Sequence, residues 1–198
     1  LPNRSSNSLF CVASRRKTPP LAAHRRLVGG NRVRRVEEVE NPNWFDPETG
    51  ALHCEAAVSL AEILEVFLPR GFFLPVTPGT KHITLGGAIA ADVHGKNHHA
   101  SGSMSAFLDS FHLLLAGGEI LDCSRDRNPE AFWATVGGMG LTGVILDARL
   151  RLKRVENAYV SVDYERVPNI DAVLESFLRN DGNHDYEVAW IDCLARGS

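Results

Sequence analysis

The sequence lacks several familiar signatures, and each absence excludes a class of protein. No run of roughly eighteen apolar residues occurs, which excludes a conventional transmembrane helix. The four cysteines, Cys11, Cys54, Cys123 and Cys193, include no C-x-x-C pair, so we expect reduced thiols rather than a zinc or disulfide framework. No G-x-S-x-G elbow and no P-loop lysine is present, so acyl transfer and nucleotide hydrolysis have no motif. A net charge of −3 gives no reason to expect nucleic-acid binding.

Acidic residues are missing from residues 1–36, which contain nine Arg or Lys, whereas residues 37–198 contain all twenty-four acidic residues. The segment shows no clear apolar period and is rich in Ser. It has three interpretations: a transit peptide, a basic arm for an anionic partner, or a disordered or wrongly bounded end. The last is the least demanding and is our prediction for 1–36, with one domain over 37–198.

Residues 37–198 have the pattern of a mixed α+β domain. Ser59 and Glu62 form a capping box before an apolar helical stripe. Apolar segments on both sides of Gly117–Gly118 predict an antiparallel hairpin. Strict alternation of apolar and charged residues from Leu146 to Lys153 predicts a strand with one buried face.

The stretch TLGGAIAADVHGKNHH has little bulk at its start and several polar residues at its end. It predicts a helix from Thr84 to Val93 with small residues on one side. The first amides of that helix are expected to point outward unpaired, ready for a phosphate or the edge of an electron-rich ring. His94 and Lys96 would place positive charge beside such a ligand. The alternative is a small-residue helix packed tightly on a sheet.

Two further patterns invite other interpretations. Gly138–Gly143 matches the dinucleotide fingerprint G-x-G-x-x-G, but a predicted helix precedes it and a strand follows, the reverse of the required order. A loop for close backbone approach and a tight turn with positive φ both stay open. His94 and His98 have the spacing of metal ligands, but Gly95 and Asn97 argue against a continuous helix, so we predict no metal site.

Several stretches together resemble the FAD-binding oxidases of the vanillyl-alcohol oxidase superfamily, in particular the decaprenylphosphoryl-ribose 2′-oxidase group. They are LPVTPGTKHITLGGAIAADVHGKNHHASGS, GGEIL, FWATVGGMGLTGVI and VAWIDCLARG. The resemblance covers roughly residues 45–198. It implies an α+β FAD-binding domain of the PCMH type, in which two subdomains hold the cofactor. A remnant of the first subdomain would end near residue 76, and the second would follow over about 77–198.

The resemblance and the residue pattern together imply a set of FAD contacts. These are Gly79, Thr80, Thr84, Leu85, Gly86, Gly87, Ala91, Asp92, Val93, His94, Gly140 and Ile145. His94 matches a family position that contacts FAD without a covalent bond, so FAD is expected to be bound non-covalently. Lys96 matches a lysine near the substrate pocket and is expected to orient the substrate.

The implied activity is hydride transfer from an alcohol carbon of a sugar or polyprenyl-phosphoryl sugar to the flavin. A sugar-lactone or alditol oxidase and a non-catalytic FAD-domain remnant are the alternatives. A reductase partner and a cytoplasmic location are further expectations. The sequence lacks the family's Gly-rich pyrophosphate loop, of which Gly29–Gly30–Asn31 resembles only the tail, and the substrate-covering domain expected after Ser198. We therefore expect this chain alone to bind FAD poorly and to be inactive.

Overall fold

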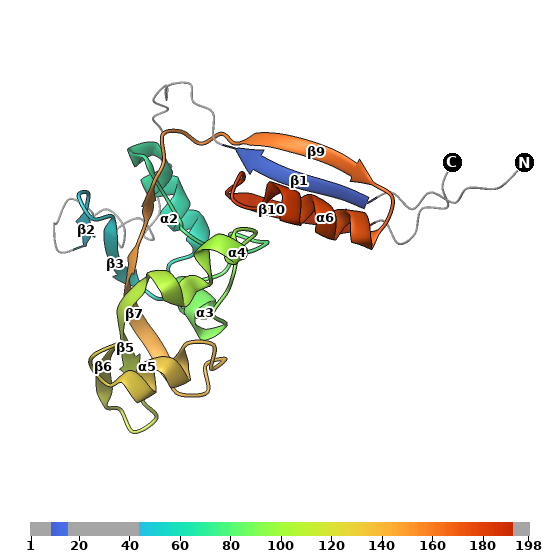
Figure 1. The fold of residues 1–198 in the computed structure, drawn as a ribbon. Helices are drawn as coiled ribbons and strands as arrows, with labels where there is room; N and C mark the ends of the chain where they lie inside the picture. Colours follow the sequence, from blue (N-terminus) through green and yellow to red (C-terminus); the bar gives the residue numbers. More distant parts are fainter. Residues whose placement is uncertain (1–8, 16–43, 192–198) are drawn as a thin grey trace, which may run out of the picture. The chain divides into compact units, whose positions relative to one another are not determined.

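The structure, a computed structural model, describes residues 9–15 and 44–191. These residues form two compact units, one of residues 44–158 and one that joins residues 9–15 to 159–191 (Figure 1). Throughout the described residues, no helix is long and apolar enough to cross a membrane. The cellular compartment stays a prediction.

Strands and short helices are interspersed along the larger unit. In chain order they are β2 (Phe45–Asp46), β3 (Ala51–Glu55), α2 (Leu60–Phe67), the 3-10 turn η2 (Leu68–Arg70), β4 (Phe72–Phe73), α3 (Leu85–Ala90), α4 (His98–Ser101), the 3-10 turn η3 (Met104–Phe107), β5 (Leu108–Leu114), β6 (Ile120–Ser124), α5 (Pro129–Thr135), β7 (Val144–Arg151) and β8 (Lys153–Arg154). Strands and helices both contribute, which confirms the predicted α+β class.

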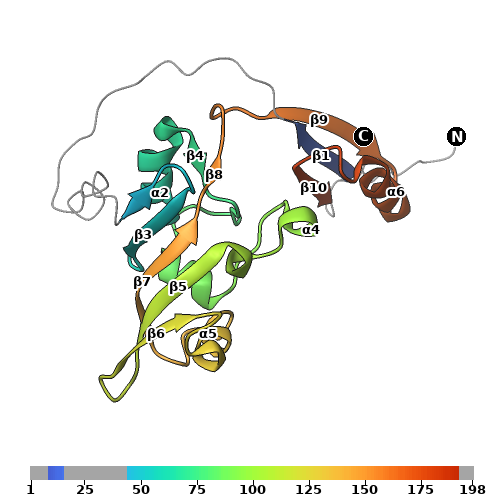
Figure 2. The same cartoon turned by 60° about the vertical axis from the view of Figure 1, so that its left-hand side comes forward.

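The centre of the larger unit is a five-stranded antiparallel sheet in the order β2-β3-β7-β5-β6 (Figure 2). The predicted alternation is confirmed in β7, where Ala148 and Leu150 are buried and Arg149 and Arg151 are exposed. β5 and β6 form the predicted hairpin. Because β7 pairs with β3 on one side and β5 on the other, residues distant in the sequence meet across it.

Helices pack on one face of this sheet and form the core with it. Phe111 of β5 stacks on Phe132 of α5, with ring centroids 5.3 Å apart and planes at 21°. Leu85 and Ile89 of α3 are fully buried. Burying a large apolar side chain contributes about 1.5–3 kcal/mol, whereas a helix as short as α3 is not stable by itself. The core therefore holds α3 and α5 in place.

Helix α2 has the predicted capping box. The Ser59 hydroxyl accepts a hydrogen bond from the amide of Glu62 at 3.2 Å, and the Glu62 carboxylate accepts one from the amide of Ser59 at 2.8 Å. The helix passes into the turn η2, which contains Pro69, and the turn ends at Gly71 with φ of 81°. Local residues therefore set both ends of α2.

Helix α3 begins after Thr84 as predicted, but it ends at Ala90 rather than at Val93. Asp92 adopts a φ of 40°, which interrupts the helical path. The amide of Val93 then donates to the carbonyl of Ala88 at 3.0 Å. The helix thus ends three residues earlier than the small-residue pattern indicates.

The smaller unit is a three-stranded antiparallel sheet with one helix. Its order is β10-β1-β9, formed by β1 (Leu9–Arg15), β9 (Ser161–Val167) and β10 (Tyr186–Ile191). The helix is α6 (Ile170–Asn180), and Asn169 caps it by accepting a hydrogen bond from the amide of Ala172 at 2.9 Å. Val167 and Val173 are the buried centre of this unit.

The domain organisation differs from the sequence-based expectation in two places. Residues 9–15, predicted to be part of a disordered or wrongly bounded segment, form β1, because β9 and β10 each offer a strand edge for their backbone groups. The predicted boundary near residue 76 separates β3 from β5 and β7, although these strands share one sheet. The motif remnant at 29–31 lies outside the described residues.

The junction between α5 and β7 generates a first prediction. A Cβ at Gly143 would lie 2.4 Å from the carbonyl oxygen of Leu114 on β5, so Gly143→Ala must push the two strands apart. At Gly140 nothing lies within 4 Å of that position, and only the φ of 77° opposes alanine, at about 1–2 kcal/mol. We expect urea unfolding to show a loss for Gly143→Ala that exceeds the loss for Gly140→Ala by about 1–3 kcal/mol. Equal losses would contradict the close approach.

Candidate cofactor site

Helix α3 presents an exposed face made of small residues. Thr84, Gly87 and Ala91 are exposed, while Leu85 and Ile89 on the opposite side are buried in the core. The three exposed positions follow the helical spacing i, i+3, i+7, so they form one flat strip. Such a surface lets a planar group approach the backbone closely.

The amides at the start of α3 correct the predicted anion site. All three that the sequence predicts to be unpaired are hydrogen-bonded within the chain, so none points outward for a phosphate. The amide of Leu85 donates to the carbonyl of Val58 at 2.8 Å, that of Gly86 to the carbonyl of Ala56 at 2.8 Å, and that of Gly87 to the hydroxyl of Thr84 at 3.1 Å. The prediction failed because the two carbonyls come from the segment before α2, which periodicity does not place beside α3.

The second glycine-rich loop lies against the C-terminal end of α3. The amide of Gly137 donates to the carbonyl of Ile89 at 3.2 Å, and that of Met139 donates to the carbonyl of Ala90 at 2.8 Å. Gly140 then adopts a φ of 77°, as a tight turn from helix to strand requires. The tertiary structure thus joins two motifs that lie about fifty residues apart in the sequence.

Asp92, one of the predicted cofactor residues, forms hydrogen bonds within the chain. Its carboxylate accepts hydrogen bonds from the amide of Ser105 at 2.9 Å, the hydroxyl of Ser103 at 2.8 Å and the hydroxyl of Ser105 at 3.3 Å. These bonds anchor the segment that leads into β5. A role of Asp92 in FAD binding stays a prediction, and the structure gives its carboxylate a positioning role.

The remaining predicted residues are distributed around this face. His94 is exposed, and its ring lies 5.2 Å from that of His98. Lys96 is exposed and forms no ion pair with any described residue. Ile145 pairs with Leu113 across β7 and β5. Of the other predicted contacts, Gly79 and Thr80 lie in the loop before α3, Gly86 lies within α3, and Val93 lies just after it.

The glycines test whether the site fits a flat cofactor. A Cβ at Gly79 or at Gly140 would meet nothing within 4 Å, and a Cβ at Gly87 would meet only the hydroxyl oxygen of Thr84 at 3.2 Å. The backbone at these positions is therefore bare and open to an approaching ring. The residues fit a planar ring system by shape, although the amides of α3 are not available to coordinate its phosphates.

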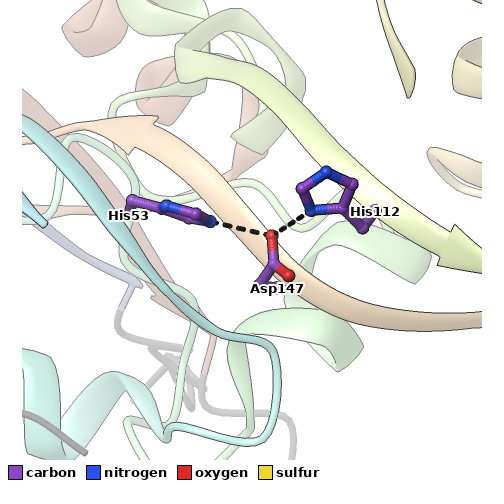
Figure 3. A group of neighbouring side chains, drawn as sticks. All are labelled: His53, His112 and Asp147. Carbon is purple, nitrogen blue, oxygen red and sulfur yellow. Dashed lines mark hydrogen bonds and ion pairs between the residues drawn. The ribbon is translucent and has the colours of Figure 1, made fainter. Parts of the chain in front are cut away.

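A separate group of polar residues belongs to no motif in the sequence. His53 of β3, His112 of β5 and Asp147 of β7 converge on the face of the sheet away from the core (Figure 3). Nε2 of His53 lies 2.8 Å and Nδ1 of His112 lies 2.7 Å from the same oxygen, Oδ1 of Asp147. Alternation indicates that each points outward, but only the strand register brings the three together.

Cys54, next to His53 in the sequence, is a buried thiol that stays protonated near neutral pH. Its side chain faces the core, and burial is the largest cause that raises the pKa of its thiol to about 12. The negative charges of Asp147 and Glu55 add to this increase. The thiolate is the reactive and metal-binding form of cysteine, so Cys54 takes no part in either kind of chemistry near neutral pH.

Comparison with known proteins assigns the class of this fold. Residues 32–124 match the family of the FAD binding domain. This match and the relatives below show that the chain belongs to the PCMH-type FAD oxidoreductases, as the sequence predicts, and that FAD is the cofactor of this domain.

The relatives are longer than this chain. Decaprenylphosphoryl-β-D-ribose oxidase of Mycolicibacterium smegmatis is 37% identical over 172 residues, which cover 85% of this chain and 37% of that protein. An uncharacterized protein in the mprA 5′ region of Streptomyces coelicolor is 40% identical over 71% of this chain and 38% of its own length. A Delta(24)-sterol reductase of Mus musculus is 26% identical over 68% of this chain and 26% of its own length. The chain thus spans less than two fifths of each of these relatives.

The contacts of Asp92 generate a second prediction. Asp92→Ala removes three hydrogen bonds and leaves half-buried donors unpaired, which should lower the free energy of unfolding by about 1–3 kcal/mol. Asp92→Asn keeps one acceptor oxygen and tolerates a positive φ, so its loss should be smaller. Urea denaturation gives both values, and amide exchange at Ser105 should accelerate most in the alanine variant. An alanine variant as stable as the asparagine variant would rule out this positioning role.

Proposed function

We propose that the protein is an FAD-dependent oxidoreductase that oxidises an alcohol carbon of a sugar-like substrate, with a polyprenyl-phosphoryl sugar as the first candidate. The observation that carries this proposal is the exposed small-residue face of α3, joined to the loop around Gly140. Its support from relatives is the 37% identity, over 85% of this chain, to a protein named as an oxidase of decaprenylphosphoryl-β-D-ribose.

The chemistry divides between cofactor and protein. When bound, FAD would supply the oxidant: the flavin would accept a hydride from the alcohol carbon, a base would take the hydroxyl proton, and a carbonyl group would form. The strip of Thr84, Gly87 and Ala91 would hold the ring by van der Waals packing, and Gly140 would offer a second point of close backbone approach. We propose that His94 contacts FAD without a covalent bond.

The phosphates of FAD require a different partner from the one the sequence predicts. Because the first amides of α3 bond to Val58, Ala56 and Thr84, they are not available for an anion. We therefore propose that α3 holds the ring system and that donors outside the α3 amides hold the pyrophosphate. The poor FAD affinity expected of this chain alone stays a prediction.

Lys96 is proposed to orient the substrate. Its ammonium group is exposed beyond the end of α3 and has no carboxylate partner among residues 9–15 and 44–191. An ammonium group offers three donors to a hydroxyl-rich or phosphorylated ligand. We propose that it acts as a positioning group rather than as a base. The expected reductase partner stays a prediction.

The face of α3 generates a third prediction. Gly87→Val places an isopropyl group on the strip, so FAD affinity should fall at least about tenfold, or 1.4 kcal/mol, with the far-UV circular dichroism unchanged. Gly117→Val is the matched control, because it lies in the β5–β6 hairpin with nothing within 4 Å. Flavin fluorescence titration measures both variants against the parent protein. Undiminished binding by Gly87→Val would remove α3 from the cofactor site.

Lys96 generates a fourth prediction, to be tested in the full-length protein. Lys96→Met removes a charge-assisted hydrogen bond and should weaken substrate binding or slow flavin reduction by at least about tenfold, with FAD still bound. The exposed Lys81, on the loop before α3, provides the control Lys81→Met. Anaerobic bleaching of the flavin by candidate sugars gives the rates. Loss of FAD with unchanged kinetics in the remaining holoenzyme would mean that Lys96 holds the cofactor instead.

The same assay separates the alternatives. Bleaching by free alditols or sugar lactones, but not by lipid-linked sugars, would favour the runner-up oxidase. A protein that binds FAD and is reduced by neither class would be a non-catalytic FAD domain. Each outcome is read from the same flavin absorbance, so the cofactor and the substrate are tested together.

A further inference from the structure

We propose that His53, His112 and Asp147 form a binding site for a divalent transition-metal ion, with Zn²⁺ the best match to their chemistry. The site lies on the face of the five-stranded sheet away from the core, and each residue comes from a different strand (Figure 3). It is independent of the proposed flavin chemistry, since it uses none of the predicted cofactor residues.

The geometry brings three ligand atoms to one point. One nitrogen from each histidine and one oxygen of Asp147 lie within 4.8 Å of one another. A zinc ion binds imidazole nitrogen and carboxylate oxygen at about 2.0–2.2 Å, so two of its ligands are at most about 4 Å apart. The two ring nitrogens lie 2.8 and 2.7 Å from Oδ1 of Asp147, so the side chains must move slightly apart to admit an ion between them.

The donor set is the one that zinc and related ions prefer. Two imidazoles and one carboxylate make the three-ligand arrangement of open zinc sites, in which water completes the shell. The side chains of His53, His112 and Asp147 are 33%, 43% and 25% exposed, which leaves room for that water. Without metal, both imidazoles are within hydrogen-bond distance of Asp147; on binding, the protons of these nitrogens move to the other ring nitrogens or to solvent.

The charges around the site favour a cation. Along one row of the sheet, Glu55 lies opposite Asp147, Asp147 opposite His112, and His112 opposite Asp122, so three carboxylates flank or join the site. Guanidinium groups of the described residues also lie near this row. Arg149 is on the same face, opposite His53, and Arg127 pairs with Asp122.

The scaffold holds the ligands in advance. The three strands are neighbours in the sheet, so backbone hydrogen bonds fix the three Cα positions whether or not a metal is present. Trp44 stacks on the ring of His53 with centroids 5.1 Å apart and planes at 19°, and its carbonyl accepts a hydrogen bond from the amide of His53 at 2.7 Å. This packing orients one ligand before an ion arrives.

A competing site is the group of histidines near α4. His94, His98 and His99 have neighbouring rings, and His94 and His98 have the i, i+4 spacing of metal ligands on a helix. Across the described ranges, however, only His53, His112 and Asp147 form a cluster of three ligand atoms close enough for one ion. The two groups lie on different elements, so single substitutions distinguish them.

The test titrates ZnCl₂ into the purified chain by calorimetry, with thermal unfolding in parallel. We expect one ion per chain and, at a free concentration of about 100 Kd, a rise in Tm of about 5 °C or more, because the ion binds only the folded sheet. His53→Gln and His112→Gln should each weaken the affinity by about 100-fold or more, since even groups behind the ligands change affinity by about 10–100-fold. His98→Gln is the matched control and should bind as the parent protein does.

Three results would overturn the proposal. The first is no binding by a parent protein that is folded by circular dichroism. The second is loss of binding in His98→Gln with retention in His112→Gln, which would place the ion near α4. The third, with Co²⁺ as a spectroscopic probe, is a thiolate charge-transfer band, because this site contains no sulfur. If His112→Gln fails to fold, His53→Gln gives the same comparison, with the rise in Tm on adding zinc measured from the metal-free Tm of that variant. None of these measurements includes FAD. A negative result for zinc binding therefore leaves the proposed function untouched.

Discussion

The pairing of β7 with β3 on one side and β5 on the other is the constraint on which the rest of this structure depends. Strand residues alternate between the two faces of a sheet, so this register decides what each face carries. The inner face receives Ala148, Leu150 and Phe111, and the helices α3 and α5 pack there. A shift of one residue in β7 would place Asp147 in the core and Ala148 in solvent.

The same register gives the two faces different chemistry. The inner face supports α3, whose outer strip is the surface proposed to contact the flavin ring. The outer face carries His53, His112 and Asp147, which meet only because three strands place them at neighbouring positions. The three residues on the outer face therefore rest on backbone hydrogen bonds between strands, whereas the strip on α3 rests on the packing of that helix against the core and on its hydrogen bonds to Ala56 and Val58.

Hydrogen-bond satisfaction decides what α3 can do. A free helix start would offer unpaired amides to an anion, but a buried amide costs free energy unless it has a partner. Here the carbonyls of Ala56 and Val58 provide that partner and also fix α3 against the segment before α2. The helix thereby gains a defined place in the fold, and its first three amides are no longer unpaired. Its small exposed residues remain the feature that suits a planar cofactor.

The sequence by itself determined the features that depend on neighbouring residues. The capping box at Ser59, the hairpin between β5 and β6 and the alternation of β7 arise from local spacing, and each is present. The motif stretches likewise identified an FAD-binding fold that comparison supports. Only the tertiary structure decided three other points: β1 as a strand, the pairing of the α3 amides, and the meeting of His53, His112 and Asp147. Each depends on partners far away in the chain, and periodicity reports which face a residue occupies but not which strand or carbonyl lies beside it.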